Sequence, residues 1–170
     1  MNLSVNIDKS GPLLRGKAPA IVQGHIDRFL DMVTQFLSVE VKKRTPQGVY
    51  GAQGGLISTI GGDVPGKGTP LAKGIVFHGS LHGDVIEKGR AAGKAWPPEG
   101  VLLRWIEVKM GLSGAEAKRV EFLIRRKIGQ RGFEGYHMFE KSLMENETRI
   151  MSMADGEKLA AGIVRDLNGE

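Results

Sequence analysis

Apolar side chains recur at intervals of three and four residues between Pro19 and Pro46, and this spacing predicts one long amphipathic helix. The apolar positions are Ile21, Ile26, Phe29, Leu30, Met32, Val33, Phe36 and Leu37. Pro19 suits the first turn of a helix, and Pro46 ends it. The basic run of residues 42–44 suits the negative end of the helix dipole.

Between residues 48 and 93 glycine is frequent and the apolar stretches are short. The stretches GLISTI and GIVFHGS carry β-branched and aromatic residues and predict two strands, with HGDVIEKG as a third. A glycine-rich segment separates the first two strands, so we expect a long hairpin loop there. An alternating segment, Leu3 to Asp8, predicts one further short strand near the N-terminus.

The helical period returns in residues 97–168. The stripe of Val101, Leu102, Trp105 and Val108 predicts a helix that begins near Pro98 and Glu99, and we expect Trp105 to anchor it to the sheet. Ser113 to Glu116 reads as a capping box for a second helix, which buries Ala117, Val120, Ile124 and Ile128. One long or two shorter helices follow from Met138 to Leu167, with an interruption near Asp155 and Gly156.

Together these elements predict an α/β fold of the α+β type. A small, mostly antiparallel sheet packs on the long N-terminal helix, and further helices fill the C-terminal half. We expect residues 1–170 to form a single domain, with a strand and long helix in 1–46, a strand region with the long hairpin loop in 48–93 and a helical region in 97–168. The 41% hydrophobic and 25% charged residues are typical of a globular protein.

The amino-acid composition excludes several kinds of functional site. The chain has no cysteine, which excludes disulfides, thiolate metal ligands and a cysteine nucleophile. No apolar run approaches the ~18 residues of a membrane span, and the N-terminus lacks a leader pattern, so we expect a cytoplasmic protein without membrane contact. The net charge of +5 and pI of about 9.6 favour contact with a polyanion, although solubility alone also accounts for a charge of this size.

The segment GGDVPGKGTP, residues 61–70, has Gly61, Gly66 and Lys67 at the spacing of a phosphate-binding loop. Gly68 stands where the magnesium-binding hydroxyl belongs, and a strand-like segment follows in place of the required helix. We therefore expect no nucleotide site. Because four of these ten residues are glycine and two are proline, few side chains can pack, and the free loop is expected to be disordered.

The histidines do not form a convincing metal or catalytic motif. His78 and His82 are four residues apart, but Gly79 and Gly83 argue against the shared helix that a zinc pair needs. Ser80 and Asp84 complete the residue types of a hydrolase triad, yet residues this close in sequence do not usually converge in those roles. We expect two partly exposed loop histidines, no metal and no cofactor.

One basic cluster leaves two interpretations open. It consists of Lys118, Arg119, Arg125, Arg126, Lys127 and Arg131, offset by Glu121 alone. On a helix it could bind phosphates, but it lacks interleaved aromatic residues, so a solvated or protein-facing surface is the favoured interpretation. Trp96 and Trp105 are expected to be packing residues rather than ligand stackers.

Three segments carry a resemblance to a known family: RTPQGVYGAQGGLISTI, VIEKGRAAGKAWPPEGVLLRWIEVKMGL and RGFEGYHMFEKSL. In order and spacing they resemble the tail-completion, or tail-component, proteins at the head–tail junction of long-tailed bacteriophages. The similarity spans most of residues 44–143. The matching positions are Gly54, Gly55, Leu56, Glu87, Gly89, Arg90, Pro97, Pro98, Trp105 and Gly135 to Phe139.

This resemblance implies a structural virion protein without an active site, which forms a six-fold ring between the head connector and the tail. The implied partners are further copies of the chain, head connector or stopper proteins, tail tube or terminator proteins and, in passing, the genomic DNA. The implied location is the virion neck or tail, and the host cytoplasm during assembly. A basic nucleic-acid-binding module is the alternative function, while a hydrolase or nucleotide enzyme is disfavoured.

The resemblance also implies a role for the hairpin loop, because long hairpins in such rings extend toward neighbouring subunits or the channel. The implied contact residues are Gly61, Gly62, Asp63, Gly66, Lys67, Gly68 and Lys73. The chain departs from the family pattern in this glycine-rich loop and in the helical segment after Glu145.

Overall fold

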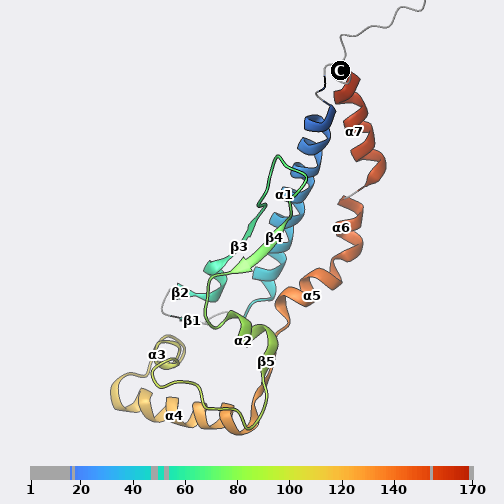
Figure 1. The fold of residues 1–170 in the computed structure, drawn as a ribbon. Coiled ribbons are helices and arrows are strands. Elements are labelled where there is room, and N and C mark those ends of the chain that lie inside the picture. Colours follow the sequence, from blue (N-terminus) through green and yellow to red (C-terminus); the bar gives the residue numbers. More distant parts are fainter. Residues whose placement is uncertain (1–15, 17, 47–49, 52–53, 154, 169–170) are drawn as a thin grey trace, which may run out of the picture. The chain divides into compact units, whose positions relative to one another are not determined.

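The computed structural model describes residues 16, 18–46, 50–51, 54–153 and 155–168, and Figure 1 shows the order of the elements. The fold is α+β, with a long N-terminal helix, short strand pairs and further helices in the C-terminal half, as predicted. The helices are α1 (Ala18–Arg44), the 3-10 helix η1 (Leu56–Thr59), α2 (Gly83–Lys88), α3 (Leu103–Met110), α4 (Gly114–Arg131), α5 (Met138–Glu145), α6 (Glu147–Met153) and α7 (Gly156–Asn168). The strands are β1 (Tyr50–Gly51), β2 (Gly54–Gly55), β3 (Ile60–Asp63), β4 (Ile75–His78), β5 (Gly89–Arg90) and β6 (Phe133–Glu134).

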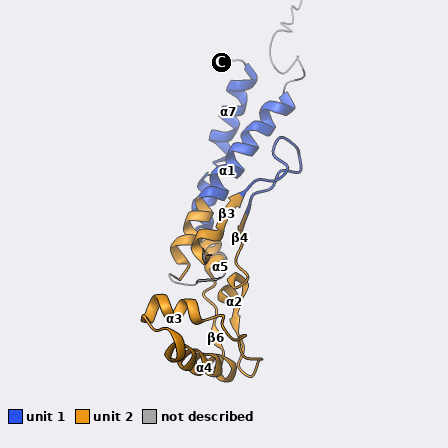
Figure 2. Ribbon diagram, turned by 90° about the vertical axis from the view of Figure 1, so that its left-hand side faces the viewer, with its two compact units in different colours: residues 1–35, 63–75, 146–170 blue, residues 36–62, 76–145 orange. Residues whose placement is uncertain are grey.

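The chain forms two compact units, coloured separately in Figure 2. Unit 1 takes in residues 1–35, 63–75 and 146–170, and unit 2 takes in residues 36–62 and 76–145. Both units combine segments that are far apart in the sequence, and α1 contributes to each. The single domain expected over residues 1–170 stays a prediction.

The long helix predicted between Pro19 and Pro46 is confirmed as α1, with Lys42, Lys43 and Arg44 in its last turn. The residues that α1 buries differ from those of the predicted apolar face. Ile26 and Met32 are exposed, whereas the polar side chains of His25, Asp27, Thr34, Ser38 and Glu40 are buried. Other segments form hydrogen bonds with His25 and Asp27, so the spacing of apolar residues does not by itself identify the covered face.

The core of unit 2 forms where the end of α1 meets the strands and α5. Its buried members are Val41, Leu56, Ile60 and Met138, with Val76, Ile86 and Phe139 packed against them. Strands pair two by two: β1 with β2, β3 with β4, and β5 with β6. The expected strand at Leu3 to Asp8 lies outside the described residues.

The first predicted strand, GLISTI, is only partly correct. Residues 56–59 form the turn η1, and the strand β3 begins at Ile60. The Ser58 hydroxyl donates to the carbonyl of Gly55 at 2.6 Å, and the Thr59 hydroxyl donates to that of Leu56 at 2.8 Å. Such local bonds to the backbone compete with a strand ladder. The second predicted strand is confirmed as β4, and a hairpin loop joins it to β3. Gly61, Gly62 and Asp63, expected in this loop, instead belong to β3.

The third predicted strand, HGDVIEKG, is wrong, because this segment forms the helix α2. Asp84 lies in its first turn and Lys88 in its last, which suits the helix dipole. Val85 is exposed and Ile86 packs against the core, so the two neighbouring β-branched residues do not share one environment. Gly89 then ends the helix with a φ of 74°.

The helices α3 and α4 pack against each other, and the residues predicted for the inner face of α4 are buried or partly buried. The prediction for α3 is only partly correct, because this helix begins at Leu103 and not near Pro98 and Glu99, and its buried residue lies outside the predicted stripe. Ile106 of α3 is fully buried, whereas Trp105 is only partly buried and Val108 is 41% exposed. Ser113 does precede α4, yet its side chain makes no capping hydrogen bond. Glu121, 1% exposed, accepts a hydrogen bond from the backbone N–H of Leu102 at 3.1 Å at the start of α3.

The C-terminal region contains three helices where one or two were predicted. The expected interruption near Asp155 is confirmed, and a second break separates α5 from α6 at Asn146. The Asp155 carboxylate accepts hydrogen bonds from the backbone N–H groups of Glu157 and Lys158, as an N-terminal capping residue does.

We predict that Ile106→Ala lowers the free energy of unfolding by about 2 to 5 kcal/mol, because it removes most of a fully buried side chain and leaves a cavity. Val108→Ala on the same helix should change it by less than about 1 kcal/mol, since that side chain already meets solvent. Urea denaturation of both variants measures the difference. Equal losses would show that Ile106 is not the core residue of this helix.

Candidate functional site

Two of the segments that carry the phage resemblance meet in unit 2. Strand β5 pairs antiparallel with β6, so that Gly89 lies opposite Glu134 and Arg90 opposite Phe133. The backbone N–H of Tyr136 continues the contact by donating to the carbonyl of Ile86 at 2.9 Å. Matching positions more than 40 residues apart in the sequence therefore form one local structure.

Glu87 connects this strand pair to α5. Its carboxylate accepts hydrogen bonds from the backbone N–H groups of Phe139 at 3.1 Å and Glu140 at 3.2 Å, and its carbonyl accepts from His137 N–H at 3.0 Å. The first N–H groups of a helix lack partners within the helix, and an anion there also interacts well with the helix dipole. Glu87 thus caps α5 from a distant part of the chain.

The glycines at this junction permit a close approach of two backbones. A Cβ atom at Gly89 would lie 2.4 Å from the nitrogen of Gly135, and one at Gly135 would lie 2.2 Å from the carbonyl oxygen of Glu87. Gly89 also has a φ of 74°, which larger residues rarely adopt. Both matching positions therefore require glycine for a structural reason.

Three other family-motif residues, Leu56, Arg90 and Pro97, also have structural roles. Leu56 is 1% exposed in the core, directly after Gly55 of β2. The carbonyl of Pro97 accepts a hydrogen bond from Arg125 Nε at 2.7 Å, and the Arg90 guanidinium donates to the carbonyl of Ala95. Gly54 lies in β2, and Pro98 is exposed before α3.

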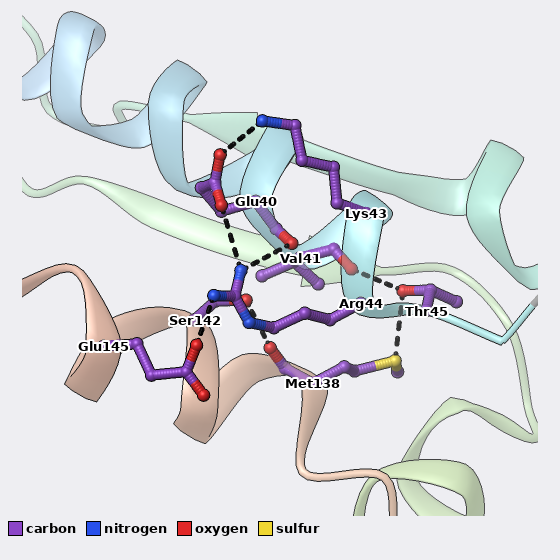
Figure 3. Close-up of polar contacts among 8 residues, drawn as sticks. All are labelled: Glu40, Val41, Lys43, Arg44, Thr45, Met138, Ser142 and Glu145. Carbon is purple, nitrogen blue, oxygen red and sulfur yellow. Dashed lines mark hydrogen bonds and ion pairs between the residues drawn. The ribbon is translucent and has the colours of Figure 1, made fainter.

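An ion-pair cluster joins the end of α1 to α5 (Figure 3). Lys43 Nζ and Arg44 Nη1 donate to the Glu40 carboxylate at 2.7 and 3.0 Å, and Arg44 Nη2 donates to Glu145 at 2.5 Å. The hydrogen bonds from Lys43 and then Arg44 lower the pKa of Glu40 below its ordinary value. The hydrogen bonds that Arg44 donates to Glu145 and, as the second cause, to Glu40 raise the pKa of Arg44.

Sequence reasoning missed this cluster. The spacing of Glu40 and Arg44, four residues apart on one helix, could have indicated their pairing. The contact with Glu145 spans 101 residues and leaves no local pattern.

The hairpin loop rests on α1 within unit 1. The backbone N–H of Gly68 donates to the Asp27 carboxylate at 2.8 Å, and Lys67 forms an ion pair with Asp31 that raises the pKa of this lysine. Inside the loop, the N–H groups of Thr69 and Lys73 bond to the carbonyls of Gly66 and Pro65. The expectation of a disordered free loop is therefore wrong, because the composition does not reveal the two aspartates that hold it.

The same loop carries the incomplete phosphate-loop pattern. The segment that follows it is the strand β4 and not a helix, as the sequence predicts. Lys67 is already engaged by Asp31, so the described loop does not aim its lysine at an open anion site.

Helix α7 also contacts α1 in unit 1. His25 Nε2 lies 2.9 Å from Asp166 Oδ2, and this hydrogen bond is the main cause of the lowered pKa of Asp166. Gly162 allows the approach, since a Cβ atom there would lie 3.1 Å from the His25 ring.

The basic cluster of α4 separates into two faces. Lys118, Arg119, Arg126, Lys127 and Arg131 are exposed, whereas Arg125 is partly buried and bonds to Pro97. Glu121 lies on the buried side of the helix, so it does not offset the exposed cations as expected. Trp96, expected to be a packing residue, packs edge-on against Phe122 with ring centroids 5.5 Å apart, although the sequence did not indicate this partner.

The two histidines do not share a helix: His78 belongs to β4 and His82 precedes α2. His78 Nδ1 lies 3.0 Å from the carbonyl oxygen of Ser80, and its ring stacks at a tilt on Phe139. Within the described ranges, no three His, Asp or Glu side chains gather as a metal site requires. The described helices include none with both the length and the apolar character needed to cross a membrane.

No protein-family model, curated protein or solved structure matches the chain. Membership of the phage tail-completion family therefore stays a prediction that rests on the residues given above.

We predict that Glu40 makes unit 2 sensitive to acid. Because its pKa is lowered on folding from 4.5, its stabilisation is present above that value and is lost as the pH falls through the lower folded-state pKa. Glu40→Gln should be less stable than the wild type near neutral pH and should show a smaller further loss below about pH 4.5. Urea midpoints at several pH values test this, with the exposed Glu99→Gln as the control. Parallel pH profiles for Glu40→Gln and wild type would contradict the assignment.

We predict that Asp27 contributes more to the attachment of the loop than Asp31 does. Asp27 is 6% exposed and accepts hydrogen bonds from Gly68 and Gln23, so Asp27→Ala should cost about 1 to 3 kcal/mol by leaving donors unpaired. Asp31→Ala removes an exposed ion pair and should cost less. Urea denaturation and hydrogen exchange at the Gly68 amide measure both effects. An unchanged exchange rate in Asp27→Ala would contradict the contact.

Proposed function

We propose that the chain is a structural virion protein of the bacteriophage neck, where copies of it form a ring that joins or completes the tail at the head–tail connector. The resemblance over residues 44–143 supports this proposal. The described contacts of Glu87, Gly89, Arg90 and Gly135 support it too, because they hold backbone segments together and need no ligand or substrate.

The observation that carries the proposal is the amount of apolar surface left uncovered. Among the described residues, large hydrophobic side chains that are exposed outnumber those that are buried. They occur on several elements: Leu71, Phe77, Leu81, Trp96, Met110, Phe122, Leu123, Leu143, Met144, Met151 and Val164 are each at least 40% exposed. Large apolar surfaces of this kind are typical of protein–protein contacts, and a ring subunit has such contacts on several sides.

Under this proposal the partners are further copies of the chain, proteins of the head connector and proteins of the tail tube. The hairpin loop, residues 64–74, then meets a neighbour while Lys67 and Gly68, near its middle, are held by Asp31 and Asp27. The exposed Leu71, 82% accessible at the end of the loop, is the side chain best placed to contact that neighbour. The proposal assigns no catalytic step and no cofactor to the chain.

A nucleic-acid-binding module is the second candidate, and one observation favours it. The exposed face of α4 carries four cations, Lys118, Arg119, Arg126 and Lys127, close to the partly exposed rings of Trp96 and Phe122. Aromatic rings beside cations are suited to bases and phosphates. The exposed Leu123 in the middle of the face is instead typical of a protein contact.

The composition and structure of purified phage particles test the neck assignment. We expect particles made from the genome that encodes the chain to contain it in a fixed number of copies, with electron microscopy placing it at the head–tail junction. Particles that join heads and tails without the chain would contradict the proposal.

Duplex DNA titration of the purified protein separates the two candidates. A phage neck protein of the proposed kind should bind duplex DNA weakly. Tight binding that falls by a factor of about 1,000 or more between 50 and 200 mM salt would favour the nucleic-acid-binding module, because several phosphate contacts cause such a loss.

A further inference from the structure

Helix α4 divides its side chains sharply between two faces. The inner face packs on α3 and contains Ala117, Val120, Glu121, Ile124 and Ile128, all buried or partly buried. The outer face repeats at four-residue spacing and contains Lys118, Arg119, Phe122, Leu123, Arg126 and Lys127, all exposed. Along this outer face, two large apolar side chains lie between two pairs of cations.

The centre of the outer face is apolar. Phe122 is 50% exposed and Leu123 is 59% exposed, and with Lys118 and Arg119 they line an open hollow of about 460 Å³. Trp96 extends the apolar area beside Phe122. Apolar side chains at the centre with charged residues at the rim are typical of a protein-binding surface.

The charge of the outer face selects its partner. Lys118 and Arg119 line the hollow, and Arg126 and Lys127 follow on the same exposed face of the helix. The exposed carboxylate nearest in sequence, Glu116, lies in the first turn of α4. A basic partner would therefore be repelled, whereas a helix with apolar side chains and carboxylates would be attracted.

Helix α5 of a second copy has these properties. Leu143 and Met144 are 55% and 67% exposed, although the same helix buries Met138 and Ser142 on its other side. Glu140 and Glu145 flank them with side chains that are 60% and 56% exposed. Glu140 also contacts His137, and Glu145 contacts Arg44. Because α5 contains two glutamates and one lysine, Lys141, which is exposed, the helix has a small excess of negative charge.

We propose that the outer face of α4 binds the Leu143–Met144 face of α5 from a second copy of the chain. The two surfaces differ, so the contact is heterologous and leaves a free α4 face on one copy and a free α5 face on the other. Repetition of such a contact closes a ring or extends a filament. This inference rests on the proposed ring function and names the surfaces that would build the ring.

Single-cysteine variants test the contact, because the chain has no cysteine of its own. Leu123→Cys is mixed with a size-tagged Met144→Cys and treated with a short bismaleimide. We expect several-fold more of the mixed dimer than of either homodimer, and a loss of the mixed dimer when Leu123→Cys also carries Phe122→Asp. Thermal melts confirm that each variant is folded, since the changed side chains are exposed.

Leu81→Cys is the matched control. Leu81 is 88% exposed in the same unit and precedes the exposed Asp84 by three residues, so this segment offers another apolar and acidic surface. If Leu123→Cys cross-links to Leu81→Cys as well as to Met144→Cys, the choice of α5 is wrong. A dominant Leu123→Cys homodimer would show a symmetric α4 contact and would also overturn the proposal.

Sedimentation of the wild type and of Leu123→Asp separates this inference from the proposed function. Assembly of the wild type that Leu123→Asp abolishes supports the contact. Equal assembly by both proteins would refute the α4 contact but leave self-assembly intact. A wild type that stays monomeric up to about 1 mM would refute the contact. The contact would also be refuted if the cysteine variants did not cross-link and Leu123→Asp lost DNA binding, because the face would then bind nucleic acid. The neck assignment is then decided by the particles alone.

Discussion

The buried side chain of Met138 is the point on which the structure of unit 2 depends. It is 0% exposed and joins Val41 of α1 with Leu56 and Ile60 of the strand region. The Thr45 hydroxyl lies 3.2 Å from its sulfur and 2.7 Å from the carbonyl oxygen of Val41, while Ser142 bonds to the Met138 carbonyl at 2.5 Å. Figure 3 shows these contacts beside the ion pair of Arg44 and Glu145.

The position of Met138 depends in turn on the junction that precedes α5. Glu87 accepts hydrogen bonds from the first N–H groups of this helix, and the close approach of Gly89 and Gly135 sets where the helix begins. This arrangement explains why the matching positions of two distant segments occur together. They define the start of α5, and α5 then completes the core.

The surfaces left outside this core account for the proposed assembly. Helix α4 covers α3 with one side and presents cations and two apolar residues on the other. Helix α5 buries Met138 and Ser142 while it exposes Leu143 and Met144. In both helices the side chains needed for folding and those available for a partner lie on opposite faces, so a partner can bind without disturbing the core.

The sequence alone determined the fold class, the extent of α1, the strand β4 and the hairpin between β3 and β4, because these features depend on local periodicity and on proline and glycine. It did not determine α2, in which Asp84 and Lys88 at the ends outweigh the strand preference of Val85 and Ile86. Nor did it identify Ile106 as the core residue of α3, since the predicted stripe contained the adjacent Trp105 and left Ile106 out. The attachment of the loop to Asp27 and Asp31, the cap that Glu87 provides and the burial of Glu121 arise only in the tertiary structure. Each of these contacts joins groups that are far apart in the sequence, so a local sequence pattern does not show which hydrogen-bond donor pairs with which acceptor.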